Sequence, residues 1–148
     1  MSERFTDAIG RKVISRASAE ELGRLTHIVI DVGQRQVRAL VTGKGRKSGL
    51  VDWEQVGGFG PDAVMVASED ALHRPRDERE RAAADGNLEL VGKRVLSDTG
   101  DSLGEATDVV FEPETGAVET LVVGEREVPA TSLLGVGSYA VVVKAPAE

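Results

Sequence analysis

The stretch Ile9-Gly10-Arg11-Lys12-Val13-Ile14-Ser15 returns later in the chain as Val91-Gly92-Lys93-Arg94-Val95-Leu96-Ser97. An internal repeat reveals the unit from which a fold is built, so it is sought before other patterns. Here the likeness continues through further blocks that occur in the same order. The matching blocks are 22–23 with 103–104, 26–31 with 107–112, 37–43 with 118–124, 51–53 with 128–130 and 58–66 with 135–143. The chain is therefore predicted to contain two copies of one structural unit.

The repeat divides the 148 residues into a first copy, residues 1–67, a linker, residues 68–87, and a second copy, residues 88–148. A domain of about 60 residues is marginally stable alone, so we expect the copies to pack together. The linker is charged, and Pro75, Asp77 with Arg81, and Gly86 could start, support and end a short helix. Because it has no apolar stripe, that helix is expected to be solvated or frayed.

Within each copy, apolar and polar residues alternate with a period of two, which indicates β-strands. Short strands separated by turns that contain glycine are typical of a small barrel or sandwich. Residues 18–22 fit a helix capping box, but the matching residues 98–103 have turn chemistry, so a reverse turn is predicted, with at most one helical turn in the first copy. In the first copy, strands are expected near residues 11–15, 25–31, 36–43, 48–52 and 63–67.

The copies share a Gly-basic-Val opening strand, a turn ending in Leu-Gly, a strand ending in an acidic residue, a Gly-ended strand, and a final strand in which Ala-Val-x-Val follows Gly-x-Gly, with Asp before the Ala in the first copy. In this order, these features resemble the PRC-barrel family, which includes the cytoplasmic domain of the photosynthetic reaction centre H subunit and the C-terminal domain of a ribosome maturation factor. The resemblance implies an all-β fold of two small antiparallel barrels in tandem, joined by a charged linker able to form a helix. It also implies protein-interaction modules, with no cofactor, metal-ligating or catalytic residues to transfer.

Composition excludes several classes of function. The chain has no Cys, so it has no disulfide framework, thiol nucleophile or Cys-ligated metal. Aromatic residues are 3% of the chain, too few for the stacking platforms that bind single-stranded nucleic acid. The net charge of −7 also disfavours direct binding to phosphate backbones. No apolar run is long enough for a membrane span and no secretory signal begins the sequence, which predicts a cytoplasmic protein.

The net charge is unevenly distributed between the copies. The first copy carries +2, the linker −2 and the second copy −7. Opposite charges on the two copies could attract each other within one chain or between chains, so self-association is one interpretation. The alternative is that these are solvated surface charges without a specific role.

Two features of the first copy are candidate partner-binding sites. Lys44, Arg46 and Lys47 lie together at the tip between two expected strands, where they could contact phosphate, anionic lipid or an acidic protein, or could form an ordinary solvated turn. Trp53, the only Trp, could anchor a partner, or could pack at one end of its barrel or between the barrels. No carboxylate has ligand spacing to His27 or His73, so both are expected to be plain surface residues.

We therefore predict a non-enzymatic cytoplasmic adaptor or regulatory protein that binds another, unidentified protein through two PRC-barrel-like domains. The alternative is a factor associated with the ribosome or RNA processing that acts through a ribosomal protein. No paired carboxylates, metal-binding set or cofactor loop stands out in the sequence, so an enzyme is not expected.

Overall fold

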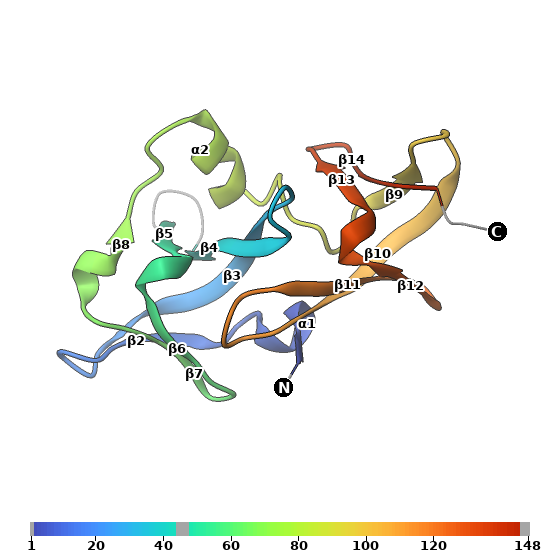
Figure 1. Ribbon diagram of the computed structural model, residues 1–148. Coiled ribbons are helices and arrows are strands. Elements are labelled where there is room, and N and C mark those ends of the chain that lie inside the picture. Colours follow the sequence, from blue (N-terminus) through green and yellow to red (C-terminus); the bar gives the residue numbers. More distant parts are fainter. Residues whose placement is uncertain (1, 44–47, 146–148) are drawn as a thin grey trace.

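Each copy is organised around one long bent strand. In the computed structural model, which describes residues 2–43 and 48–145, this strand is β3 (Glu21–Asp31) in the first copy and β10 (Ser102–Phe111) in the second (Figure 1). The beginning of β3 pairs with β2 (Lys12–Ser15), and its later part pairs with β4 (Gln36–Thr42). In the same way, β10 pairs with β9 (Arg94–Ser97) and then with β11 (Val118–Val123).

A bulge lies in each long strand at the residue where its pairing partner changes. Thr26 is the bulged residue of β3, and its Oγ1 donates to the carbonyls of Val41 and Gly43 at 3.1 and 2.9 Å. The aligned Thr107 is bulged in β10, and its Oγ1 lies 3.3 Å from the carbonyl of Val122. A bulge bends a strand and increases its twist. These threonines therefore help one long strand to pair with strands on both sides of its barrel.

Within the described residues, the remaining strands complete two seven-stranded sheets, of which one holds strands of the first copy and the linker and the other holds strands of the second copy and one strand from the start of the chain. Short 3-10 helices join equivalent strands in the two copies: η2 (Trp53–Gln55) joins β5 to β6, and η4 (Ala130–Ser132) joins β12 to β13. A further 3-10 helix, η3 (Glu69–Ala71), precedes the last strand of the first sheet. The strands not yet named are β5 (Gly49–Asp52), β6 (Val56–Phe59), β7 (Ala63–Val66), β8 (Leu72–His73), β12 (Arg126–Pro129), β13 (Leu133–Val136) and β14 (Ala140–Val143).

The all-β prediction is confirmed, but the prediction that the barrels are antiparallel is wrong for one pair of strands in each copy. Strand β7 runs parallel to β2, and β14 runs parallel to β9. The cause is the step from β5 through η2 into β6, where the chain passes to the other side of the barrel without a hairpin reversal. The strand that follows β6 therefore returns in the same direction as β2.

The two copies meet at a seam with approximate twofold symmetry. Residues 35–37 of the first copy lie antiparallel to residues 116–118 of the second, with Gln36 opposite its own aligned residue, Ala117. The amide of Val37 donates to the carbonyl of Gly116 at 2.8 Å, and the amide of Val118 donates to the carbonyl of Arg35 at 2.9 Å. The alignment of the two copies maps each of these hydrogen bonds onto the other. Equivalent turns of the two copies therefore bind each other.

The segment that leads into each copy packs against the other copy. Strand β1 (Glu3–Arg4) pairs with β10, and the short helix α1 (Phe5–Ala8) inserts Phe5, whose ring lies edge-on 5.2 Å from that of Phe111. In the reciprocal contact, Glu89, near the start of the second copy, bonds to His27 of β3. One continuous apolar core therefore contains residues of both copies, as the small size of each copy predicts.

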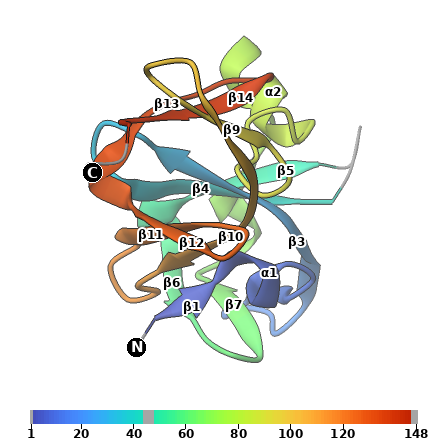
Figure 2. The same cartoon turned by 90° about the vertical axis from the view of Figure 1, so that its right-hand side faces the viewer.

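The linker is folded against the first copy. Strand β8 pairs with β5, and helix α2 (Glu78–Ala84) lies over the outer face of the same sheet, as Figure 2 shows from the side. The expectation of a solvated or frayed helix is wrong, because Ala83 and Ala84 are buried in a second, smaller core with four residues of the sheet. Those four residues are Val29, Ala39, Val41 and Leu50.

Substitution of Gly116 tests the seam. A Cβ at this position would lie 2.7 Å from Nε1 of Trp53, and the backbone φ of +80° disfavours other residues. Gly124, with φ +62° and no atom within 4 Å of its Cβ position, provides a control for the backbone cost alone. We expect Gly116→Ala to lower the free energy of unfolding in urea by about 1 kcal/mol more than Gly124→Ala. In a Trp53→Ala background the difference should vanish, and equal costs in the wild-type background would contradict this account of the seam.

Candidate functional site

The sequence-predicted partner-binding residues fall in different places. Lys44, Arg46 and Lys47 lie outside the described residues, so their role stays a prediction. Trp53 belongs to η2 and lies at the seam, with its ring close to Gly116 of the second copy. Its centroid is 5.9 Å from that of Phe59, at an interplanar angle of 44°. Trp53 therefore packs between the copies, and a further role in binding a partner stays a prediction.

The seam is asymmetric in the side chains that fill it. On the other side of the twofold axis, Ala130 is the residue equivalent to Trp53, and Arg35 is the residue equivalent to Gly116. Ala130 is buried, and the Arg35 guanidinium donates to the carbonyls of Ala130 and Thr131 at 3.0 and 3.1 Å. On each side of the axis, a large residue thus packs against a small one. The 3-10 helix supplies the large residue on one side, and the turn supplies it on the other.

A surface hollow adjoins Trp53, and we name it the seam hollow. It lies between β6 and the turn that joins β10 to β11, and it contains two aromatic rings, two successive glycines and one carboxylate. The residues that line it are Trp53, Val56, Gly57, Gly58, Phe59, Pro113 and Glu114. The side chains of both copies therefore form its walls.

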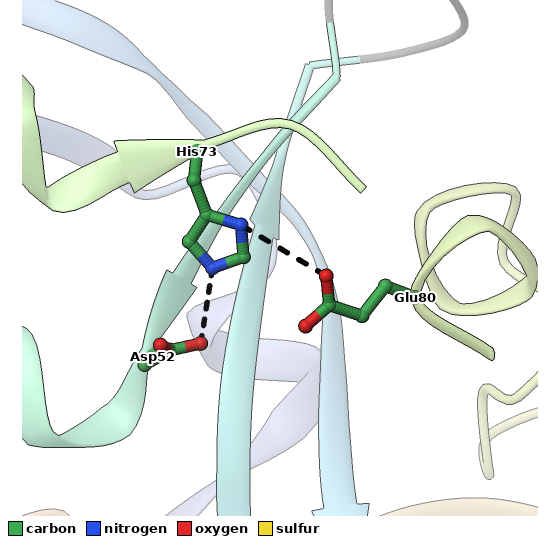
Figure 3. Close-up of side chains that lie close together, drawn as sticks. All are labelled: Asp52, His73 and Glu80. Carbon is green, nitrogen blue, oxygen red and sulfur yellow. Dashed lines mark hydrogen bonds and ion pairs between the residues drawn. The ribbon is translucent and has the colours of Figure 1, made fainter. Parts of the chain in front are cut away.

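A second cluster joins the linker to the first copy. Figure 3 shows His73 of β8 between Asp52 of β5 and Glu80 of α2. His73 Nε2 lies 3.1 Å from Asp52 Oδ1, and Nδ1 lies 4.0 Å from Glu80 Oε1 and 2.9 Å from the carbonyl oxygen of Arg74. Arg76 contacts both carboxylates, at 2.7 Å from Glu80 and 3.6 Å from Asp52. We call Asp52, His73, Arg76 and Glu80 the linker latch.

The linker latch fits hydrogen bonding better than metal binding. Ligand atoms of Asp52, His73 and Glu80 lie within 4.8 Å of one another, which is close enough to consider an ion. The two carboxylates, however, approach different ring nitrogens, which point in different directions, so the closest contacts do not converge on one point. The guanidinium of Arg76 already supplies a positive charge to both carboxylates.

The expectation that both histidines are plain surface residues is wrong. His73 takes part in the linker latch, and His27 Nδ1 lies 3.0 Å from Glu89 Oε2. Each histidine thus has a carboxylate partner that is distant in sequence, by 21 residues for His73 and 62 for His27. Local spacing could not reveal these partners, because the path of the linker across the sheet determines them.

An exposed apolar patch lies on the outer face of β9, β14 and the β13–β14 hairpin. Val142 pairs in register with Leu96 on one side and Gly135 on the other. Tyr139, in the turn of the hairpin, has 71% of its surface exposed. We call Leu96, Val136, Tyr139 and Val142, which line a shallow hollow there, the Tyr139 patch. This patch was not predicted from the sequence, although the alignment of Tyr139 with Asp62 was a usable signal.

The comparisons with known proteins concern the family. A family model described as PRC-barrel domain matches residues 1–72 and 88–145, which covers both copies. No curated protein matches the chain. No helix in the described part of the chain is both long and apolar enough to cross a membrane.

The linker latch predicts a pH-dependent contribution to stability. Hydrogen bonds from Arg76 lower the pKa of Glu80 from its ordinary 4.5 to about 2. Since the folded-state pKa is lowered, the contribution is fully present above the unfolded pKa and is lost as the pH falls towards 2. Glu80→Gln should therefore reduce the free energy of unfolding by about 0.5–1 kcal/mol at pH 7, and the difference should shrink between pH 5 and pH 3.

Glu78→Gln provides the matched control, because it removes the same charge from the exposed side of the same helix. Thermal unfolding of both variants across this pH range measures the effect. If Glu78→Gln and Glu80→Gln have the same pH dependence, Glu80 has no special role in the attachment of the linker.

Proposed function

We propose that this chain, which belongs to the PRC-barrel family, is a non-enzymatic cytoplasmic adaptor or regulatory protein that binds another protein. The observation that carries this proposal is the Tyr139 patch. Tyr139 is a large residue that is mostly exposed, and aromatic residues of this kind are enriched where proteins bind each other.

A comparison of the copies supports a role for this patch beyond folding. The aligned residue in the first copy is Asp62, and both copies form the same strands around these positions. The barrel therefore does not require an aromatic residue in this turn. Arg94 Nη1 lies 3.3 Å from the Tyr139 hydroxyl, and its guanidinium carbon lies 5.8 Å from the ring centroid, which helps to hold the ring in position.

The charge of the second copy indicates the chemistry of the partner. With −7 on residues 88–148, the second copy should attract a basic protein surface more readily than an acidic one. Ribosomal proteins are one class of basic partner, so association with the ribosome through such a protein is the alternative form of the proposal. Association between copies of this chain through the mildly basic first copy is a further outcome that the same experiment would detect.

The proposal predicts that Tyr139→Asp, which introduces the residue found in the first copy, weakens binding of the partner. We expect recovery of the partner by affinity purification from the native host to fall at least tenfold, since loss of a central aromatic residue typically costs about 2 kcal/mol or more. Ile9→Ser, at an exposed apolar residue of the first copy, should leave recovery unchanged.

The identity of the recovered protein separates the forms of the proposal. A basic ribosomal protein would favour the alternative, and a second copy of this chain would favour self-association. A variant with Lys44, Arg46 and Lys47 changed to Glu tests the basic tip in the same assay. If wild type and Tyr139→Asp recover the same proteins in equal amounts, the patch is not the binding surface.

A further inference from the structure

We infer that the seam hollow is a binding site for an extended, proline-containing segment of a partner protein with a basic residue next to the proline. This inference rests on the proposed function, because it names the kind of segment that the adaptor would bind. The site is separate from the Tyr139 patch, so the two surfaces can be tested independently.

The shape of the seam hollow suits a proline ring. Trp53 and Phe59 are inclined to each other at 44°, which leaves two flat apolar walls that meet at an angle. Gly57 and Gly58 contribute no side chains, so the backbone of a bound segment can approach closely. The hollow of about 230 Å³ is smaller than a site for a drug-sized molecule and fits one or two side chains.

The aromatic walls of the seam hollow favour a segment in the polyproline II conformation. Such a segment makes no internal hydrogen bonds, so its backbone stays solvated while its prolines pack on the aromatic rings of a groove. Proline itself has no N–H to leave unpaired against the aromatic walls.

The charge at the rim favours a cation beside the proline. Glu114 lines the seam hollow. No ion pair to its carboxylate is formed by the described residues. An Arg or Lys of the bound segment would therefore find an acceptor here, whereas an acidic residue would be repelled.

The second copy carries a side chain at the bulge that Gly57 occupies in the first. Gly57 and its aligned residue Leu134 are both bulged residues, of β6 and β13 respectively. At the related position of the seam, Leu134, Val136 and Ala130 stand where the seam hollow has Gly57, Phe59 and Trp53. Leu134 is 50% exposed, so the barrel accepts a leucine at this bulge, whereas Gly57 places no side chain beside the two aromatic rings.

Titration with a synthetic peptide tests the inference. The probe is acetyl-Pro-Pro-Arg-Pro-Pro-amide, followed through the fluorescence of Trp53, the single Trp of the chain. We expect a saturable change with the full-length protein. Replacement of the peptide Arg by Glu, or of its prolines by Ala, should weaken binding at least tenfold.

Two protein variants locate the binding site. Gly57→Leu should abolish saturable binding, because it introduces the residue that the second copy carries at the same bulge. The matched control is Leu134→Gly, which opens the related position where no aromatic wall exists and should leave binding unchanged. Should Gly57→Leu fail to fold, Glu114→Lys serves instead, and it should weaken binding of the Arg peptide and strengthen binding of the Glu peptide.

The outcomes distinguish this inference from the proposed function. Equal binding by wild type and Gly57→Leu, or no saturable binding by wild type at millimolar peptide, would overturn the assignment of the seam hollow. Neither result would affect recovery of a partner through Tyr139. If Tyr139→Asp recovers the partner as well as wild type does while the peptide still binds, the Tyr139 patch is not the binding surface. The assignment of the seam hollow would be unaffected.

Discussion

The arrangement of the whole chain depends on the pair of backbone hydrogen bonds that cross the seam. They join Val37 to Gly116 and Val118 to Arg35, and each is the symmetry equivalent of the other. Contacts between equivalent surfaces are usual at twofold axes between separate subunits, and here one chain supplies both sides. With equivalent turns joined at the axis, Phe5 and Phe59 both contact Phe111, and neither copy has to form a core alone.

Away from the axis, the two copies differ most at positions where their shared fold does not require a particular residue. Buried positions such as Val13 and Val95, or Leu40 and Leu121, are the same in both copies because both barrels need them. Trp53 and Ala130 differ because Trp53 packs against Gly116, whereas Ala130 packs against the larger Arg35. Gly57 with Leu134 and Asp62 with Tyr139 have no such reason in the packing of the barrels, which makes them the positions where specific binding could be encoded.

The sequence predicted the features that repeat or alternate, and it missed those that depend on the path of the chain. The two copies and their principal strands followed from the alignment and from the period of two, as in Val37, Ala39 and Val41. The parallel pairing of β2 with β7 was missed because it depends on a step without reversal at η2, which has no strong sequence signal. Trp53 could be recognised as a candidate from its rarity, but the glycines and Pro113 beside it come together only in the folded seam.

The linker demonstrates how a small apolar signal can be decisive. Ala83 and Ala84 make no hydrophobic stripe by the usual criterion, yet small side chains allow a helix to approach a sheet closely. The face of the sheet under these two alanines is also apolar. Its buried residues are Val29, Ala39, Val41 and Leu50. In the second copy the aligned residues are Val110, Thr120, Val122 and Glu127, a more polar set on which no described helix lies. The composition of the first sheet therefore reflects the presence of α2, and the linker is better regarded as part of the first copy's structure than as a tether between two independent barrels.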